Sequence, residues 1–264
     1  MTPDIITIVL GLFVGMILAL TGAGGTILSI PLLVFFLHLS IPQAAPVALF
    51  ALMLSAGIGA LRGLRVGTVR YKAAGLMAVL GMATAPVGVS LGHYLPSNLV
   101  GILFSIVLAY VAIRMWHGTT TESLNSQPAP CQINPATSKL FWTAPCTARL
   151  GASGSVAGLL SGLLGVGGGF VIVPSLHKVS NFDMQTIIAT SLAVIALISI
   201  SGFLTYTLHS NINWGIVLPF GISTLAGTLM GRTIAVKIPA KLSQRMFSIL
   251  AITASALLFI KQFV

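Results

Sequence analysis

Long apolar runs alternate with short polar stretches along almost the whole chain. Six uninterrupted runs reach the length of about 20 residues that crosses a bilayer core of roughly 30 Å. They are residues 43–62, 72–93, 97–116, 184–206, 214–235 and 242–262. Two further apolar segments, 4–37 and 151–178, are each interrupted by a cluster of glycines. Residues 117–148 are rich in Ser, Thr, Pro, Asn and Gln, and we expect them to form a polar linker.

The second part of the chain repeats the first at a constant offset of 143 residues, without a gap. Gly22 corresponds to Gly165 and Pro31 to Pro174 in this register. Matches on glycine and proline are informative, because both residues have specific backbone requirements. The pattern predicts a tandem duplication of residues 1–116 and 149–264, in which each half holds one glycine-interrupted segment and three spans.

The basic residues are distributed differently in the two halves. The first half places its basic residues between its first and second uninterrupted spans, whereas the second half places them between its second and third spans. They are Arg62, Arg65, Arg70 and Lys72 in the first half and Arg232, Lys237, Lys241 and Arg245 in the second. Cytoplasmic loops carry an excess of Lys and Arg, so equivalent loops are predicted on opposite sides of the membrane.

This inversion requires an odd number of crossings in each half. With three uninterrupted spans, each glycine-broken segment must therefore enter the membrane and return on the same side. The predicted fold is an all-α polytopic membrane protein of two inverted-topology repeats, each a re-entrant helical hairpin plus three transmembrane helices. Both termini are expected outside the cytoplasm and the linker 117–148 inside.

The composition excludes a soluble domain, since 56% of the residues are hydrophobic and only 6% are charged. The net charge of +10 would suggest a nucleic-acid partner in a soluble protein. Here the basic residues lie between spans, where they set orientation, so the expected partner is the lipid bilayer of the cytoplasmic (inner) membrane and not nucleic acid. Cys131 and Cys146 both lie in the polar linker, so their positions imply neither a disulfide framework nor a metal cluster, and their role is left open.

The two glycine clusters are the candidate substrate site. Irregular backbone at membrane depth is tolerated only where protein or a water-filled cavity satisfies it, and the helix that follows each break would direct its N-terminus at an anion. Close helix packing is the alternative role for the glycines, and for the hydroxyls of the next span. The predicted substrate-binding residues are Thr21, Gly22, Gly24, Gly25, Thr26, Gly165, Gly167, Gly168, Gly169, Thr190 and Ser191.

At these residues the chain resembles the TauE/SafE family of membrane permeases, which is named for sulfite export. The resemblance rests on Gly22-Ala23-Gly24-Gly25 and Gly165-Val166-Gly167-Gly168-Gly169, on Pro31 and Pro174 after them, and on the run ATSLAVI at 189–195. It implies transport of sulfite, organosulfonates or related small anions.

The first half departs from this pattern, because Val47 and Ala48 stand where the second half has Thr190 and Ser191.

The polar inventory limits the mechanism. The only acids are Asp4, Glu122 and Asp183, all expected at span ends or in the linker, so a carboxylate proton relay within the membrane is not available. No catalytic residue, metal site or cofactor is expected. An anion transporter, with export favoured, is the leading hypothesis, and an anion channel or an uptake permease for another organic anion remains open. Sodium, a proton or no coupling ion, and a second copy of the chain as partner, are also left open.

Arg232 is the one basic residue that could reach inward, with a snorkelling side chain as the alternative.

Overall fold

The protein is built from helices. The computed structural model describes residues 3–21, 25–116, 131, 143–209, 212–235 and 240–261. The helices in these residues are α1 (Pro3–Thr21), the short 3-10 helix η1 (Gly25–Leu28), α2 (Ser29–Phe36), α3 (Ile41–Val66), α4 (Tyr71–Tyr94), α5 (Ser97–Trp116), α6 (Ala144–Leu164), α7 (Gly169–Val179), α8 (Met184–His209), α9 (Trp214–Ala235) and α10 (Ala240–Lys261). The predicted all-helical class is confirmed.

Local signals in the sequence set the helix ends. Ser40 and Gln43 form a reciprocal capping box at the start of α3, and Gly67 ends that helix in the left-handed conformation at φ 75°. Asp183 caps α8, because its Oδ2 accepts the Thr186 N–H at 3.1 Å. Helix α3 therefore extends beyond the predicted span 43–62 at both ends, whereas α8 begins at the predicted residue 184 and continues three residues past the predicted end at 206.

The predicted linker 117–148 is too long at its C-terminal end. Helix α6 already begins at Ala144, since the Thr143 hydroxyl accepts the Cys146 N–H at 3.4 Å and Pro145 lies in the first turn. A threonine cap followed by proline is a helix start that the polar composition of the segment concealed. Residues 117–130 and 132–142 of the linker lie outside the described residues.

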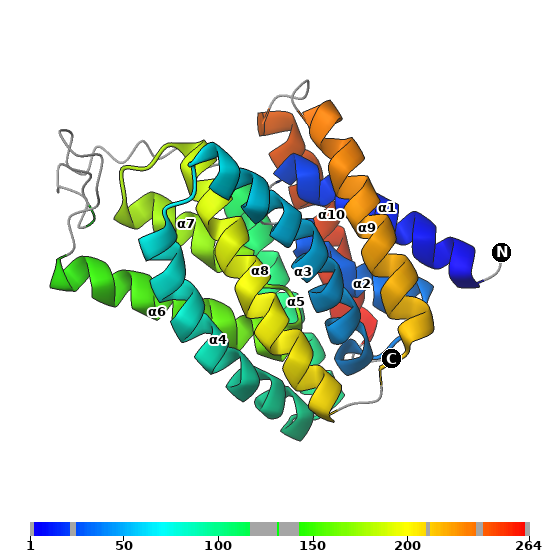
Figure 1. The fold of residues 1–264 in the computed structure, drawn as a ribbon. Coiled ribbons are helices and arrows are strands. Elements are labelled where there is room, and N and C mark those ends of the chain that lie inside the picture. Colours follow the sequence, from blue (N-terminus) through cyan, green and yellow to red (C-terminus); the bar gives the residue numbers. More distant parts are fainter. Residues whose placement is uncertain are drawn as a thin grey trace.

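Helices α3 and α8 lie side by side in the middle of the molecule (Figure 1). Helices α4 and α6 pack together on one flank of this pair, and α1 and α9 pack together on the other. Helices α5 and α10 form a further packed pair. Each of these four pairs therefore joins a helix of residues 3–116 to a helix of residues 144–261.

Glycines show the direction of the helices on one flank. A Cβ on Gly154 of α6 would meet Met77 of α4. A Cβ on Gly162, two turns later, would meet Ala85, also two turns later. Helices α6 and α4 therefore run parallel, in contact along a row of glycines that brings their backbones close together.

The other flank has the same arrangement. A Cβ on Gly11 of α1 would meet Phe220 and Ser223 of α9, and a Cβ on Gly15 would meet Thr224 and Thr228. Helices α1 and α9 are thus also parallel, again along glycines.

The central pair runs antiparallel. Gly63 near the end of α3 faces Ala189 near the start of α8, whereas Gly202 late in α8 faces Leu49 early in α3. Gly59, also late in α3, faces Arg232 near the end of α9. The end of α3, the start of α4, the start of α8 and the end of α9 consequently lie together. We call this the basic end of the bundle, because Arg62, Arg65, Arg70, Lys72 and Arg232 belong to these segments.

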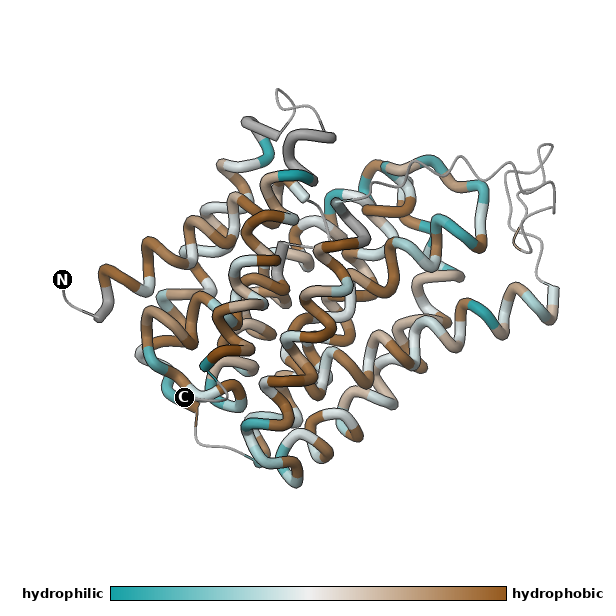
Figure 2. Tube along the Cα trace, turned by 180° about the vertical axis from the view of Figure 1, so that it is seen from behind, coloured by the Kyte–Doolittle hydropathy of each residue, from teal (hydrophilic) through white to brown (hydrophobic). Residues whose placement is uncertain are grey.

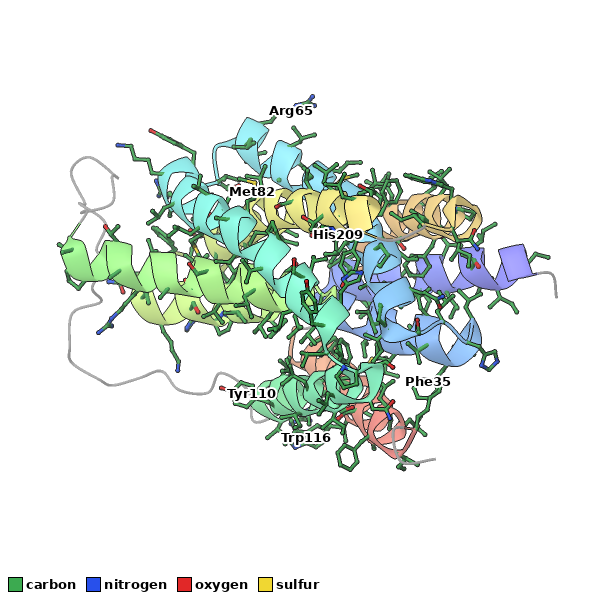
Figure 3. The ribbon with its side chains drawn as sticks, turned by 90° about the horizontal axis from the view of Figure 1, so that it is seen from below. Phe35, Arg65, Met82, Tyr110, Trp116 and His209 are labelled. Atoms are coloured by element: carbon green, nitrogen blue, oxygen red, sulfur yellow. A yellow bond between two sulfur atoms is a disulfide. The ribbon has the colours of Figure 1, made fainter. Side chains whose placement is uncertain are left out.

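The surface of the bundle is largely apolar. Figure 2 shows hydrophobic colouring along most of the length of the helices. Four helices in the described residues are long and apolar enough to cross a membrane: Ile41–Val66, Tyr71–Tyr94, Met184–His209 and Trp214–Arg232. Large apolar side chains such as Val79 and Val87 on α4 are exposed, and so are Tyr110 and Trp116 on α5 (Figure 3). The chain is therefore a multi-pass membrane protein.

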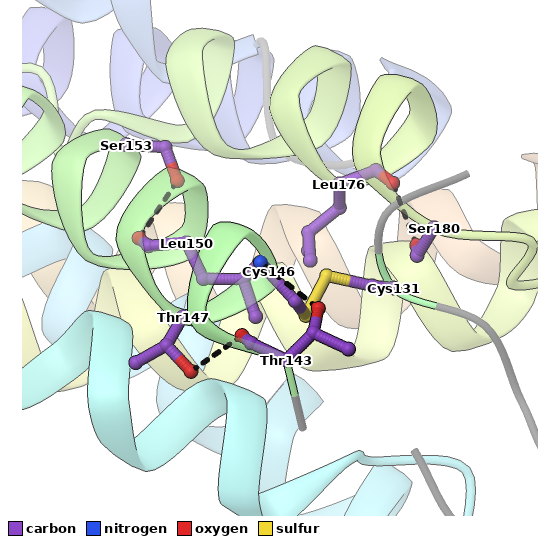
Figure 4. Close-up of a disulfide and its surroundings, with 8 residues drawn as sticks. All are labelled: Cys131, Thr143, Cys146, Thr147, Leu150, Ser153, Leu176 and Ser180. Atoms are coloured by element: carbon purple, nitrogen blue, oxygen red, sulfur yellow. Dashed lines mark hydrogen bonds between the residues drawn. A yellow bond between two sulfur atoms is a disulfide. The ribbon is translucent and has the colours of Figure 1, made fainter. Parts of the chain in front are cut away.

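Cys131 and Cys146 form a disulfide, a role for these cysteines that the sequence left open. Both are fully buried, and Figure 4 shows the bond between them. Cys131 is held beside the end of α7, where its N–H donates to the Val179 carbonyl at 3.0 Å, and Cys146 lies in the first turn of α6. The bond thus ties the start of α6 to the end of α7, a proximity that sequence spacing alone does not reveal.

Candidate functional site

The second glycine cluster interrupts the hairpin of α6 and α7. Gly165, Gly167 and Gly168 have φ values of 69°, 69° and 67°, in the left-handed region that glycine adopts without steric cost. Gly165 ends α6 by donating its N–H to the Ser161 carbonyl at 2.8 Å, and Gly168 is the residue before α7. The chain reverses here between Leu164 and Gly169, and residues 165–169 are buried. We call residues 165–169 the glycine break.

The glycine break lies against both central helices. A Cβ on Gly167 would lie 2.7 Å from Leu52 Cδ1 of α3 and 3.1 Å from Ile195 Cγ2 of α8. A Cβ on Gly165 would lie 2.6 Å from the Cα of Ala45 on α3. Any side chain at these positions would therefore collide with α3 or α8, so the glycines also serve close packing.

Three buried hydroxyls in the described residues have no hydrogen-bond partner: those of Ser55 on α3, Ser161 on α6 and Ser199 on α8. Ser161 and Ser199 are 0% exposed and Ser55 is 2% exposed. Ser199 lies directly at the break, with its Oγ 3.4 Å from the position of a Cβ on Gly167. Because an unpaired buried hydroxyl is costly, each of these groups is available to a ligand that accepts or donates a hydrogen bond.

Helix α7 begins at the glycine break without a side-chain cap. The first N–H groups of a helix have no partner within the helix and carry a partial positive charge. At the end of α6, by contrast, a side chain satisfies a backbone group: the buried Tyr206 hydroxyl donates to the Gly162 carbonyl at 3.1 Å. The break therefore presents amide and hydroxyl donors, a combination that suits a small anion.

Thr190 and Ser191 occupy different faces of α8. The Thr190 Oγ1 accepts the Arg70 N–H at 3.1 Å, beside the start of α4. Ser191 instead lies on the face of Ile195 and Ser199, at successive intervals of four residues, which is the face that meets the break. Its hydroxyl donates to the Ile188 carbonyl at 2.9 Å and keeps its acceptor capacity.

The first glycine cluster is described only in part. Gly22 and Gly24 lie outside the described residues, and Gly25 and Thr26 open η1. Thr21 is the last residue of α1, and its hydroxyl donates to the Ile17 carbonyl at 2.8 Å. That these residues share one site with the glycine break 165–169 stays a prediction.

Sequence reasoning missed the three unpaired serines. Ser199 follows Ser191 by two helical turns, and Ser161 precedes Gly165 by one turn. Those spacings were the available signal. They became informative only once the structure showed that α3 and α8 both contact the glycine break.

Charged side chains lie away from the break. Asp183, before the start of α8, accepts hydrogen bonds from the side chain and N–H of Thr186, and these lower the pKa of Asp183 below its ordinary value. Arg70 lies near Phe182, with its Cζ 5.7 Å from the ring centroid. Among the described residues, no group of three or more His, Cys, Asp or Glu side chains could hold a metal ion.

The chain is similar to a known protein family over almost its whole length. The model of the family described as "Sulfite exporter TauE/SafE" matches residues 7–258. A relative from Xylella fastidiosa (strain Temecula1) is 28% identical, over 95% of this chain and 93% of its own. The YunE protein of Bacillus subtilis (strain 168) is 27% identical, over 90% of both chains. A relative from Methanocaldococcus jannaschii is 28% identical, over 75% of this chain and 70% of its own.

All three relatives carry the name "Probable membrane transporter protein", which states no substrate. No solved structure matches the chain. A helical bundle with an apolar surface, a buried glycine break and a family match that spans the membrane helices lead to one assignment. The chain belongs to the TauE/SafE family of membrane transporters.

Proposed function

We propose that this transporter moves a small sulfur oxyanion, sulfite or an organosulfonate, out of the cell by alternating access around the glycine break. The observation that carries the proposal is the buried Ser199 hydroxyl, which has no partner and faces Gly167 at the start of α7. The printed description of the family supplies the substrate class. The proposed binding groups are the amides of Gly167, Gly168 and Gly169 and the hydroxyls of Ser191 and Ser199, while Gly165, whose N–H donates to the Ser161 carbonyl, makes the reversal before them.

The arrangement of the helices supports two inverted repeats. The helices that correspond in the duplication are α1 with α6, α3 with α8, α4 with α9 and α5 with α10. Exchanging the two halves leaves the packed pairs unchanged, since α1–α9 becomes α6–α4 while α3–α8 and α5–α10 become themselves. Helices α3 and α8 run in opposite directions, as corresponding helices of an inverted repeat do. Inverted repeats with broken helices are typical of transporters with a site at the bilayer midplane.

The path of α6 and α7 supports a re-entrant hairpin. Helix α6 starts at the basic end, because it runs parallel to α4. After α7 the chain is again at that end, where Phe182 meets Arg70. By the same reasoning α2 returns to the end where α1 begins, since Lys261 at the end of α10 donates to the Val34 carbonyl at 3.3 Å. Thr21, Gly22, Gly24, Gly25 and Thr26 then form the corresponding part of the site.

The charge distribution supports the orientation. Arg62, Arg65, Arg70, Lys72 and Arg149 all belong to helix ends at the basic end. We place this end in the cytoplasm by the positive-inside rule, with both termini outside and the linker inside. An inside-negative membrane then favours outward movement of an anion by about 2.3 kcal/mol per charge per 100 mV. Export therefore needs no coupling ion in this proposal.

Transport is tested with purified protein in liposomes loaded with sulfite, an alkanesulfonate, sulfate or chloride. We expect saturable, electrogenic flux of sulfite or the sulfonate and none of chloride, with no requirement for a sodium or pH gradient. Flux that does not saturate and includes chloride would show a channel. Flux of none of these anions from protein that unfolds cooperatively would contradict the substrate class. Gradient dependence would identify a coupling ion.

A further inference from the structure

Arg232 on α9 reaches across to the two central helices at the basic end. A Cβ on Gly59 of α3 would lie 2.7 Å from Nη2 of Arg232 and 2.9 Å from Cδ1 of Leu192 on α8. Real Cβ atoms do not approach other atoms so closely, so the missing side chain of Gly59 is what makes room for the guanidinium. Gly59 thus forms the floor of a cradle for Arg232, and Leu192 forms its wall.

No carboxylate in the described residues neutralises this guanidinium. The chain has 13 Lys and Arg but only 3 Asp and Glu. Asp4 begins α1, which runs parallel to α9, so it lies at the opposite end from Arg232. Asp183 is engaged as the cap of α8. Glu122 lies outside the described residues.

A second positive charge acts on the same place. Arg62 follows Gly59 by one turn of α3, and its charge repels that of Arg232. Arg232 is half-buried, so water screens this repulsion less than it would at an exposed site. Arg62 is exposed and Arg232 is half-buried, and two neighbouring guanidinium groups without a carboxylate beside them in the described residues favour an anion between them.

The Ser55 hydroxyl lies one turn deeper on the same face of α3. Side chains four residues apart on a helix lie about 5–6 Å from each other, which places Ser55 beside the space under the Arg232 guanidinium. Ser55 is buried and unpaired, and Leu52, which meets Gly167 at the glycine break, is one further turn along. The unpaired Ser55 hydroxyl therefore lies on α3 between Arg232 at the basic end and the glycine break.

We propose that Arg232, with Arg62 beside it and Ser55 one turn deeper, forms a second oxyanion site on the route between the basic end and the glycine break. The site rests on the proposed function, since its ligand is the transported anion. A guanidinium presents a planar fork of donors that matches two oxygens of sulfite or a sulfonate, and the Ser55 hydroxyl supplies a further donor. A phospholipid headgroup offers the same oxyanion chemistry, and the experiment separates the two sources.

The variants Arg232→Gln, Arg232→Lys and Gly59→Ala test the site. Gly59→Ala keeps the charge but displaces the flexible tip of the arginine. Two control variants match them. Arg65→Gln removes an exposed arginine that points away from the bundle (Figure 3). Gly202→Ala adds a Cβ to the corresponding glycine of the other half, where it would meet only Leu49, at 3.2 Å.

The first measurement is anion binding, detected as the rise in unfolding temperature of the detergent-solubilised full chain with increasing sulfite. Arg232→Gln is expected to raise the half-saturating sulfite concentration about 10- to 100-fold, as loss of a charge-assisted hydrogen bond does. Arg232→Lys and Gly59→Ala should have smaller effects in the same direction, and both controls should match the wild type. Equal binding by Arg232→Gln and wild type would overturn the proposal.

The second measurement is sulfite flux in liposomes of phosphatidylcholine alone or with phosphatidylglycerol. For the proposed site, the half-saturating concentration of Arg232→Gln rises equally in both lipids. An effect confined to liposomes with phosphatidylglycerol would mean that Arg232 binds a headgroup and would overturn the site. Sulfite binding that depends on Arg232 without flux would contradict the transport function and leave the site intact.

Discussion

The Ser199 hydroxyl oxygen lies 3.4 Å from the point that a Cβ on Gly167 would occupy, and it has no hydrogen-bond partner. Helix α8 thus brings a polar atom to the glycine break, where the chain reverses between α6 and α7. A fully buried unpaired hydroxyl costs folding about 1–3 kcal/mol, a cost that a bound oxyanion would remove by accepting its hydrogen bond.

Replacing Ser199 with alanine should separate stability from transport. We expect Ser199→Ala to be as stable as the wild type or more stable, by up to about 1–3 kcal/mol, because it deletes an unsatisfied group. Its half-saturating sulfite concentration in liposomes should rise. The control is Ser105→Ala on α5, which loses a hydrogen bond to the Gly101 carbonyl and should be less stable by about 1 kcal/mol with normal flux. Lower stability of Ser199→Ala with unchanged flux would contradict the assignment.

The break glycines should tolerate no side chain. Gly167→Ala combines a left-handed backbone at φ 69° with steric overlap against Leu52 and Ile195, so we expect a loss of about 1–2 kcal/mol from the backbone and a further loss from the overlap. Gly67→Ala is the matched control, since Gly67 has φ 75° but nothing within 4 Å of its Cβ position. It should lose only about 1–2 kcal/mol. Unfolding midpoints of the purified variants measure both, and equal losses would refute a tightly packed break.

The parallel seam of α4 and α6 depends on close backbone approach. A Cβ on Gly158 would collide with the carbonyl of Gly81, so Gly158→Ala should push the two helices apart and lower the unfolding temperature. Gly75→Ala, on the same α4 but with nothing near its Cβ position, should leave stability unchanged or raise it by up to about 1 kcal/mol. Thermal unfolding of the two variants side by side is the measurement. Similar behaviour would mean that the seam is not tight.

Acid should loosen the start of α8 through Asp183. Its pKa is lowered in the folded protein by the hydrogen bonds from Thr186, so the stabilisation is present above about pH 4, the ordinary value for aspartate, and is lost as the pH falls through the lowered pKa. Asp183→Asn keeps a good helix cap without a titrating charge and should lack this acid-dependent loss. Unfolding temperatures measured from pH 6 to pH 2.5 compare the two. Parallel curves would exclude Asp183 as the source.

The disulfide and the proposed orientation make opposite predictions for the living cell. The proposed cytoplasmic location keeps Cys131 and Cys146 among reducing thiols, so after rapid acid quenching of cells both cysteines should react with a maleimide in denaturant at neutral pH. The oxidised purified protein should be about 3 kcal/mol more stable than Cys131→Ser, the value for a closed loop of 15 residues. A disulfide already complete in cells would place the linker on the oxidising side and overturn the orientation.

Local sequence signals were sufficient for the helices. Ser40, Gly67 and Asp183 end or begin α3 and α8 close to where the apolar runs placed them, because caps and glycine act within a few residues. The start of α6 was missed only because Thr143 and Pro145 stand in a polar segment. Helix existence and type followed from the pattern of apolar residues.

The polar part of the site could not be found in the same way. A serine within an apolar helix gives no sign of whether its hydroxyl bonds to the preceding turn, as that of Ser191 does, or remains unpaired, as that of Ser199 does. The difference depends on which helix crosses at that height. The pairing of Cys131 with Cys146 likewise depends on the position of the end of α7, which no local pattern specifies.

The two parallel seams have a consequence for synthesis of the protein. Helix α1 finds its main packing partner in α9, which begins almost 200 residues later. At about 5–20 residues per second, the ribosome needs on the order of 10–40 s to supply it. During this interval the glycine face of α1, with Gly11 and Gly15, meets lipid or the insertion machinery in place of α9. The first half of the chain must therefore wait in the membrane, inserted but unassembled, until the second half is complete.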